Sequence, residues 1–418
     1  MAKKNKPAIR FKEFTDAWEQ RKLGEVVERI TRKNENLEST LPLTISAQYG
    51  LINQNEFFDK RIASKDVSGY FLVRNGEFAY NKSTSSDAPW GAIKRLDSYE
   101  SGVLSTLYIV FKISDERKTS SDYIVTYYNT DLWHKGIQAI AAEGARNHGL
   151  LNVAPADFFE TNLTMPKDYA EQQQIGSFFQ QLDHLITLHQ RKYDKLQVLK
   201  KAMLEKMFPK NGSSVPEIRF KGFTDAWEQR KLGEVVERIT RKNENLESTL
   251  PLTISAQYGL INQNEFFDKR IASKDVSGYF LVRNGEFAYN KSTSSDAPWG
   301  AIKRLDSYES GVLSTLYIVF KISDERKTSS DYIVTYYNTD LWHKGIQAIA
   351  AEGARNHGLL NVAPADFFET NLTMPKDYAE QQQIGSFFQQ LDHLITLHQR
   401  ELEKLQNIKK SMLEKMFV

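Results

Sequence analysis

Residues 170–208 read AEQQQIGSFFQQLDHLITLHQRKYDKLQVLKKAMLEKMF, and this stretch decides the fold. It contains no proline, and Gly176 is its only glycine. A seam of mostly apolar side chains recurs every seven residues, at Ile175, Leu182, His189, Leu196 and Met203. This spacing is typical of a helix that packs along another helix. At 1.5 Å per residue the stretch predicts a rod of about 57 Å.

The whole domain that contains this stretch occurs twice. Residues 14–191 recur without a change as residues 223–400, an offset of 209. The second rod keeps the seam, at Ile384, Leu391, His398, Leu405 and Met412. A period this long excludes a solenoid, whose repeats span about 20–50 residues. The sequence therefore predicts two units of one architecture, joined by a turn-rich linker at 209–216.

Each unit begins with a globule. Residues 41–111 carry short runs rich in β-branched and aromatic side chains, separated by Gly, Asn and Ser, which predicts strands. Ser121 and Asp122 can cap a helix that continues to a stop near Gly144. Each globule is thus expected to be a mixed α+β domain of roughly 150 residues, enough for its own core.

An amphipathic rod of this length needs a partner for its apolar stripe, and the other rod supplies one. We expect the rods to pair as an antiparallel coiled coil, with a globule at either end and an approximate two-fold axis between them. The alternative is that each rod packs only on its own globule. The expected segments are 1–165 (first globule), 166–208 (first helix), 209–216 (linker), 217–374 (second globule) and 375–418 (second helix).

Composition excludes several classes of protein. The 418 residues carry 55 Lys and Arg against 53 Asp and Glu, and cysteine is absent, which excludes disulfides and thiolate chemistry. Neither a membrane span nor the apolar core of a signal peptide is present, so we expect a cytoplasmic protein. Common nucleotide-binding, metalloprotease and hydrolase motifs are missing, and the histidines show no metal-ligand spacing. A binding scaffold is favoured over an enzyme.

Two polar loops in each globule are candidate binding sites. The repeated stretch has 19 Lys and Arg against 23 Asp and Glu, which argues against binding by charge alone. A positive window nevertheless spans 60–95, and Arg and Asn are residues that pair with base edges. Ordinary turns are the structural alternative, because Asn, Ser and Gly also populate them. The candidates are Asn81, Lys82, Ser83, Thr84, Trp90, Lys94, Arg95, Arg146, Asn147 and His148, with Asn290, Lys291, Ser292, Thr293, Trp299, Lys303, Arg304, Arg355, Asn356 and His357 in the second copy.

Two motifs carry a family resemblance. Residues 14–25, FTDAWEQRKLGE, open each unit, and residues 164–183, TMPKDYAEQQQIGSFFQQLD, lead into the rod. Together with the loop at 144–152, these motifs and the duplicated globule–rod plan resemble the specificity (S) subunit of type I restriction–modification enzymes. The resemblance covers nearly the whole chain.

The resemblance implies two target-recognition domains that each read one half of a bipartite site in double-stranded DNA. It implies that the paired helices act as a ruler and dock two methyltransferase subunits, which use S-adenosylmethionine to methylate adenine. Two motor–nuclease subunits, when present, bring ATP, Mg and cleavage. The S subunit itself is expected to be non-catalytic, without a cofactor, a metal or a membrane partner.

One feature departs from the family pattern. The two recognition domains of such subunits typically differ, whereas here 178 residues are identical. Identical readers related by a two-fold axis predict a palindromic target: a half-site, an unread spacer and the reverse complement of that half-site. The alternatives are a symmetric protein-interaction scaffold without a DNA role, an unrecognised nuclease, and an S subunit that guides methylation without cleavage.

Overall fold

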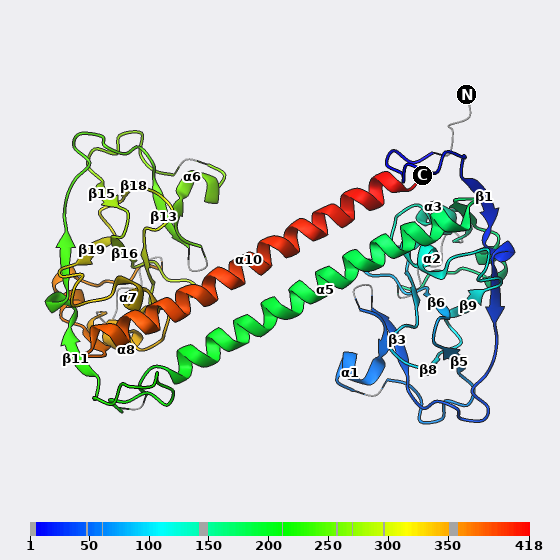
Figure 1. Ribbon diagram of the computed structural model, residues 1–418, viewed down its shortest axis with the longest axis horizontal. Helices are drawn as coiled ribbons and strands as arrows, with labels where there is room; N and C mark the ends of the chain where they lie inside the picture. Colours follow the sequence, from blue (N-terminus) through cyan, green and yellow to red (C-terminus); the bar gives the residue numbers. More distant parts are fainter. Residues whose placement is uncertain are drawn as a thin grey trace. The chain divides into compact units, whose positions relative to one another are not determined.

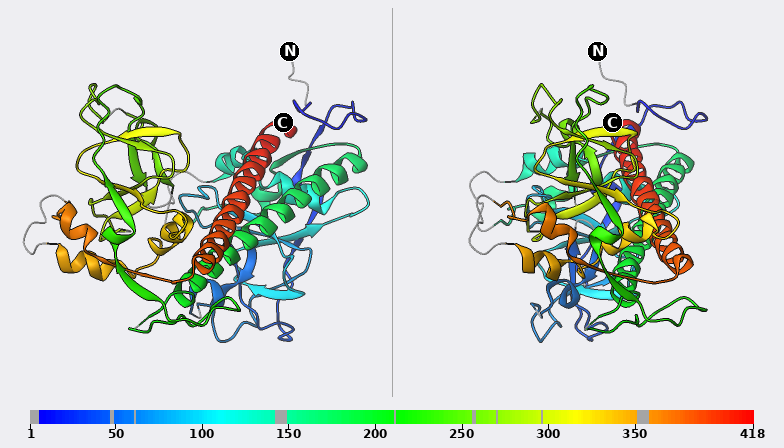
Figure 2. Two further views of the ribbon diagram at one scale, coloured as in Figure 1. Left: turned by 60° about the vertical axis from the view of Figure 1, so that its left-hand side comes forward. Right: turned by 90° about the vertical axis from the view of Figure 1, so that its left-hand side faces the viewer.

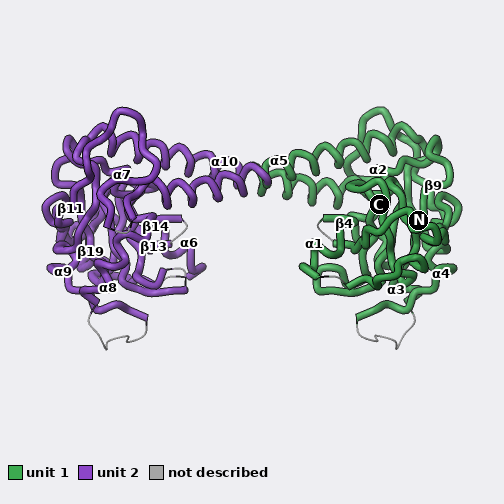
Figure 3. The backbone as a smooth tube through the Cα atoms, turned by 90° about the horizontal axis from the view of Figure 1, so that it is seen from below, with its two compact units in different colours: residues 1–190, 400–418 green, residues 191–399 purple. Residues whose placement is uncertain are grey.

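The computed structural model describes residues 6–46, 49–60, 62–141, 149–210, 212–255, 258–269, 271–295, 297–350 and 358–418. The chain forms two compact units (Figure 3). Unit 1 consists of Met1–Gln190 together with Arg400–Val418, and unit 2 consists of Arg191–Gln399. Each unit therefore contains one globule, the first half of its own long helix and the second half of the other repeat's helix.

The globule of unit 1 is built on antiparallel strands, as predicted for 41–111. Its main sheet has the order β2-β9-β6-β7, formed by Val27–Ile30, Ile109–Ile113, Phe78–Asn81 and Ala92–Arg95. Three smaller pairs complete it: β1 (Glu19–Lys22) with β10 (Asn162–Met165), β3 (Leu43–Ser46) with β4 (Gly50–Asn53), and β5 (Phe71–Arg74) with β8 (Ser101–Leu104).

The helices of unit 1 are short except for the rod. They are the 3-10 helix η1 (Leu23–Glu25), α1 (Gln54–Phe58), α2 (Ser121–Tyr127), α3 (His134–Ile140), α4 (Pro155–Phe159) and α5 (Tyr169–Lys206). The prediction of a single helix from Ser121 to Gly144 is wrong. The Thr130 hydroxyl donates to the Tyr127 carbonyl oxygen at 2.7 Å, and Leu132 N donates back to that hydroxyl at 3.3 Å. This threonine turn separates α2 from α3.

Aromatic rings hold the globule together. Phe78 and Phe111 stack across the main sheet with ring centroids 5.3 Å apart, and Tyr80 stacks on Phe158 of α4 at 5.0 Å. The rings of Phe78, Phe111 and Tyr80 are fully buried. Such ring pairs contribute about 0.5–1.5 kcal/mol beyond the area that they bury. They fix α4 against the sheet.

The motif that leads into α5 anchors this helix on the globule. The carboxylate of Glu171 is buried, and both of its oxygens accept from the guanidinium of Arg10, at 2.6 and 2.8 Å. The side chain of Gln172 accepts from Ser120 N at 2.9 Å and donates to the Pro166 carbonyl oxygen at 2.9 Å. A Cβ at Gly176 would collide with Asp122, so this glycine allows α5 to lie directly against α2.

Within unit 1, the second half of α10 (Tyr378–Met416) lies antiparallel to the first half of α5 (Figures 1 and 2). Lys409 pairs with Asp183 at 2.5 Å. Eight residues further on, directly after the end of α10, Phe417 meets Phe179, which precedes Asp183, at a centroid distance of 6.1 Å. Because the partner number falls as the residue number rises, the two helix halves run in opposite directions. The predicted antiparallel pairing is confirmed within this unit.

The end of α10 closes the core of unit 1. Phe417 is 6% exposed and packs against Trp18 and Tyr123, with centroid distances of 5.9 and 5.7 Å. Ile9 N donates to the Lys415 carbonyl oxygen at 3.0 Å, which ties the N-terminal segment to the same helix end. Phe417, at the end of the chain, therefore belongs to the same core as Trp18, near its beginning.

Unit 2 repeats this arrangement with the helices exchanged. Lys200 of α5 pairs with Asp392 of α10 at 2.5 Å, and Phe208 packs on Trp227 at 5.7 Å. Its other elements are β11 (Glu228–Lys231), η2 (Leu232–Glu234), β12 (Val236–Ile239), β13 (Leu252–Ser255), β14 (Gly259–Asn262), α6 (Gln263–Phe266), β15 (Phe280–Arg283), β16 (Phe287–Asn290), β17 (Ala301–Arg304), β18 (Ser310–Leu313), β19 (Ile318–Ile322), α7 (Ser330–Tyr336), α8 (His343–Ile349), α9 (Pro364–Phe368) and β20 (Asn371–Met374).

Candidate nucleic-acid interface

The first predicted loop leaves the main sheet at the end of β6. Asn81 Oδ1 accepts from Ser83 N at 3.0 Å, an Asx turn that redirects the chain as soon as the strand ends. The loop returns through Gly91, which has a φ of 78°, and a Cβ at this position would collide with the Asn81 carbonyl oxygen. The glycine thus allows the two ends of the loop to approach closely.

The loop pairs with the segment that follows the second predicted loop. Thr84 N and the Thr84 hydroxyl both donate to the Gly149 carbonyl oxygen, at 2.6 and 3.0 Å. Leu151 N donates to the Lys82 carbonyl oxygen at 2.9 Å, and Ser83 and Leu150 form an isolated β-bridge. Residues 81–84 and 149–151 therefore form one surface, which we term the loop edge of unit 1.

The loop edge of unit 2 consists of residues 290–293 and 358–360. Thr293 N and its hydroxyl donate to the Gly358 carbonyl oxygen at 2.7 and 3.0 Å, and Leu360 N donates to the Lys291 carbonyl oxygen at 2.9 Å. The Asx turn from Asn290 to Ser292 is kept at 3.0 Å. The two units thus present the same backbone geometry at this place.

Six of the predicted residues lie outside the described residues. They are Arg146, Asn147 and His148 of the first copy and Arg355, Asn356 and His357 of the second. The segment that contains them rejoins the described chain at Gly149 and Gly358, directly at the loop edges. The sequence analysis gave the two loops as separate candidates. In the structure, residues 149–151, which follow the second loop, pair with residues 81–84 of the first loop.

The polar side chains of the loop edge differ in exposure. Ser83 and Ser292 are exposed, and Thr84 and Thr293 are half-buried. Lys82 is half-buried, with Nζ 3.5 Å from the Val153 carbonyl oxygen, and burial lowers the pKa of its ammonium group. Lys291 has the same surroundings and the same direction of shift.

Trp90 and Trp299 contribute to the support of the loop. The Tyr80 hydroxyl donates to the Trp90 carbonyl oxygen at 2.9 Å, and the ring of Trp90 is half-buried against the core. Burial raises the pKa of Tyr80 far above its ordinary value of 10.0, so this hydroxyl stays a donor. Tyr289 holds Trp299 in the same way, also at 2.9 Å.

Lys94 and Arg95 lie on β7, the strand that pairs with β6, and both have partners inside the globule. The ammonium group of Lys94 donates to Asn129 Oδ1 at 2.8 Å, and burial lowers its pKa to about 8, helped by the nearby charge of Lys409. Arg95 pairs with Asp97 at 2.6 Å and with Asp122 at 2.8 Å.

The same contacts occur in unit 2. Lys303 donates to Asn338, and Arg304 pairs with Asp306 and Asp331. These intramolecular partners favour a structural role for the four side chains. Their contact with DNA stays a prediction.

Sequence reasoning placed residues 134–140 inside one long helix and named no candidate residue on α3 or on its copy α8. Lys135 and Gln138 are exposed on α3, which precedes the second loop directly, and Lys344 and Gln347 are exposed on α8. The expectation of one continuous helix hid this element. A signal was present in Thr130-Asp131, a pair of residues that favours turns and helix starts.

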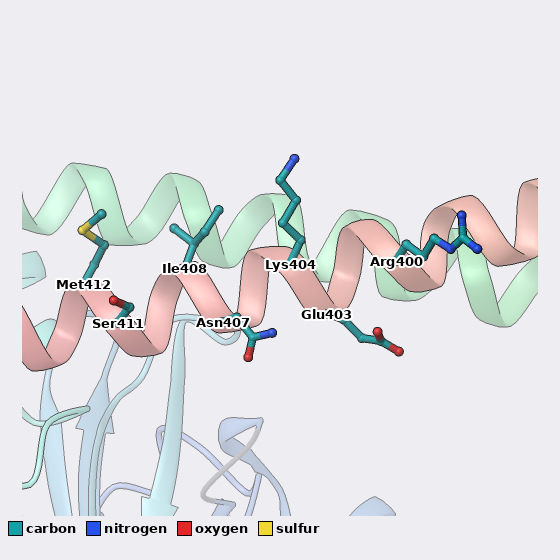
Figure 4. A pocket seen from close by; sticks show the side chains of 7 residues that line it. All are labelled: Arg400, Glu403, Lys404, Asn407, Ile408, Ser411 and Met412. Carbon is teal, nitrogen blue, oxygen red and sulfur yellow. The ribbon is translucent and has the colours of Figure 1, made fainter. Parts of the chain in front are cut away.

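Other kinds of site find little support. Across the described residues, no three His, Asp or Glu side chains gather in a way that could hold a metal ion. A shallow depression of about 550 Å³ lies along α10, lined by Arg400, Glu403, Lys404, Asn407, Ile408, Ser411 and Met412 (Figure 4). All seven come from one helix, so the lining brings no side chains together from different elements. Within the described chain, no helix has both the length and the apolar character that crossing a membrane requires.

The comparisons with known proteins bear on the fold. No family model and no curated protein matches the sequence. The type I restriction–modification S subunit from M. genitalium has a similar structure, with a TM-score of 0.62 and 13% sequence identity over 99% of both chains. The HsdS subunit from Thermoanaerobacter tengcongensis aligns over 96% of both chains at 15% identity, with a TM-score of 0.41.

The first of these comparisons defines the class of fold: this chain has the fold of a type I restriction–modification S subunit. The fold implied by the sequence motifs is thereby confirmed, with two α+β globules and two long helices.

Proposed function

We propose that this chain is the DNA-recognition subunit of a type I restriction–modification complex. One observation carries the proposal: a chain with the S-subunit fold presents the same loop edge twice, at 81–84 with 149–151 and at 290–293 with 358–360. Two copies of one reading surface suit a target made of two equivalent half-sites.

The proposed target is a bipartite site in double-stranded DNA, palindromic if the two units are related by a two-fold axis. The loop edges, with Arg146, Asn147 and His148 and their copies, would read the half-sites. Trp90 and Trp299 would support the loops. Hydrogen bonds from Arg and Asn to base edges supply sequence information, whereas contacts from lysine to phosphate position the protein.

The chain itself would be non-catalytic and hold no cofactor. Two methyltransferase subunits would supply S-adenosylmethionine chemistry and methylate adenine, and two motor–nuclease subunits, where present, would use ATP and Mg to cleave. We expect this assembly in the cytoplasm. The expected segments 1–165 and 217–374 would be the reading domains, with 166–208 and 375–418 as the helices to which the methyltransferases dock.

A methylation map tests the proposal. DNA from cells that carry this chain and its methyltransferase partner is compared with DNA from cells that lack only this chain. We expect a methyl-adenine motif that depends on the chain, is bipartite and reads the same on both strands. An asymmetric motif or a direct repeat would contradict the two-fold arrangement.

If removing this chain from the cells removes no methyl-adenine motif from the map, DNA recognition by the chain is contradicted. Co-purification of the partner without any preference for DNA would then favour the interaction scaffold. Cleavage of DNA by the purified chain alone with a divalent metal would favour the nuclease.

A further inference from the structure

Helix α3 presents a polar face that packing inside unit 1 does not use. Its inner face is buried through Ile137 and the preceding Trp133, at 2% and 7% exposure. Its outer face carries Lys135, Gln138 and Ala139, all exposed. In the part of the chain that the structure describes, neither the ammonium group of Lys135 nor the side-chain amide of Gln138 has a hydrogen bond or an ion pair. Helix α8 shows the same pattern.

The start of α3 is fixed to the same support as the loop edge. The ring of Trp133 meets the ring of Tyr80 edge-on, with centroids 6.2 Å apart. Tyr80 immediately precedes Asn81, and its hydroxyl holds Trp90. In unit 2 the corresponding pair, Tyr289 and Trp342, has the same spacing of 6.2 Å. Helix and loop edge are therefore positioned by one buried tyrosine.

The outer face of α3 has the chemistry of base reading. The amide of Gln138 offers a donor and an acceptor side by side, the pattern that pairs with N7 and N6 of adenine in the major groove. The exposed methyl group of Ala139 is adjacent in sequence, and small apolar groups contact the methyl group of thymine. Lys135 lies one turn earlier on the same helix, as a cation for a phosphate or a guanine edge.

Within residues 131–140, one exposed cation is matched by one exposed anion. Lys135 is offset by Asp131, the carboxylate that faces His134 at 3.5 Å. A face without net charge is poorly suited to hold DNA through its phosphates. It is suited to discriminate between base pairs once the duplex is in place.

We propose that α3 and α8 enter the major groove and that Gln138 and Gln347 each read the adenine of an A·T pair, one in each half-site. This inference rests on the proposed function and extends it beyond the loop edges. It adds one specific contact per unit, on a helix that leads directly into the second loop.

The duplication supplies an internal control for the test. Gln138→Ala is introduced in unit 1 only, and the methyltransferase complex is mapped in cells and then purified. We expect one half-site to become degenerate at a single A·T position while the other half-site is unchanged, so that the palindromic motif becomes asymmetric. Discrimination at that position should fall by roughly 5- to 150-fold in competition binding to duplexes that differ at one base pair.

Two further variants sharpen the result. Gln138→Glu should change the base preferred at the same position from adenine to cytosine, because a carboxylate accepts a hydrogen bond from the cytosine amino group. Gln20→Ala, at an exposed glutamine on β1, should leave both half-sites unchanged. The melting temperature of each variant should equal that of the parent chain, since the side chains are exposed.

Each failure has a distinct meaning. An unchanged palindrome with Gln138→Ala overturns the role of α3 in reading. If methylation falls by the same factor at every site while the motif stays the same, the role of α3 in reading is also overturned, and the contact is to the DNA backbone. If the parent chain directs no motif at all, the proposed function itself fails.

Discussion

At the scale of single residues, the buried ammonium groups of Lys94 and Lys303 stand out. Lys94 lies beside the ion pair of Asp183 with Lys409, so three charged groups from β7, α5 and α10 meet in unit 1. Two of the three are cations. Burial lowers the pKa of Lys94 from 10.5 to about 8, and Lys409 contributes in the same direction, while Asp183 opposes it.

We predict that Lys94→Met stabilises unit 1 at pH 7. The unfolded chain holds the Lys94 proton more tightly than the folded chain, so the penalty is fully present below pH 8 and disappears as pH rises toward 10.5. The shift corresponds to about 3 kcal/mol, from which the lost hydrogen bond to Asn129 removes about 1 kcal/mol. Denaturant unfolding at pH 7 and pH 10 measures the difference.

Lys303→Met is the matched variant in unit 2, where burial also lowers the pKa to about 8. It should show the same gain and the same pH dependence. A difference from the parent chain that stays constant between pH 7 and pH 10 would show that the charge of Lys94 is not the cause.

The loop arginines make a second prediction at this scale. Replacing Arg146 and Arg355 together with alanine should relax specificity at one base pair of each half-site, by about 1–3 kcal/mol per lost contact. Replacing Lys82 and Lys291 should instead weaken binding to all sequences and reduce its salt dependence. Binding to a panel of duplexes at several salt concentrations separates the two effects. An unchanged motif in the arginine variant would place reading elsewhere in the globule.

The sequence predicted the turn at the start of the first loop better than it predicted the contacts of single side chains. Turn chemistry is local, so Asn81 to Thr84 could be recognised from neighbouring residues. The surroundings of Lys94, and the ion pair of Arg95 with Asp122, could not, because they involve α2, α5, α10 and the turn at Asn129. A local excess of cations therefore looked like a binding patch although part of it is internal.

At the scale of elements, strong periodicity was the best guide. The heptad seam predicted α5 and α10 to within a few residues, and the β-rich runs predicted the strands of the globule. The helix expected from Ser121 to Gly144 failed because its apolar residues suit two short helices as well as one long helix. Only the threonine turn at Thr130 decides between them.

The exchanged helix ends give a prediction of their own. Phe417→Ala should destabilise unit 1 by about 3–5 kcal/mol, the usual loss for a buried phenylalanine, and leave unit 2 unaffected. Phe208→Ala should do the reverse, because Phe208 is 3% exposed in the core of unit 2. Hydrogen exchange resolved by peptide reads the two units separately. Equal destabilisation of both units by either variant would contradict the assignment of the helix ends.

At the scale of the whole molecule, the boundaries of the units fall inside the long helices. They lie between Gln190 and Arg191 in α5 and between Gln399 and Arg400 in α10. Seven residues added at both places would preserve the heptad phase and every contact inside each unit. The same addition to one helix only would leave the two rods with different lengths.

We predict that the double insertion keeps both half-sites and lengthens the unread spacer. Seven helical residues add about 10.5 Å, which corresponds to roughly 3 base pairs of B-DNA at 3.4 Å each. The single insertions should lower the yield of active complex. A methylation map gives the spacer directly, and an unchanged spacer would show that the helices do not set the distance.

The interleaving of the two repeats also affects how the chain matures on the ribosome. Unit 2 is one continuous stretch and can fold as soon as Gln399 has emerged. Unit 1 begins first but is completed by Arg400–Val418, so we expect its aromatic core around Trp18 and Tyr123 to close only after unit 2 has been synthesised. During that interval, Phe208 is the side chain that can occupy the place of Phe417 in unit 1, because it makes the equivalent contact in unit 2. We therefore expect the N-terminal half of the chain to complete its core after unit 2, the reverse of the order in which the two halves are synthesised.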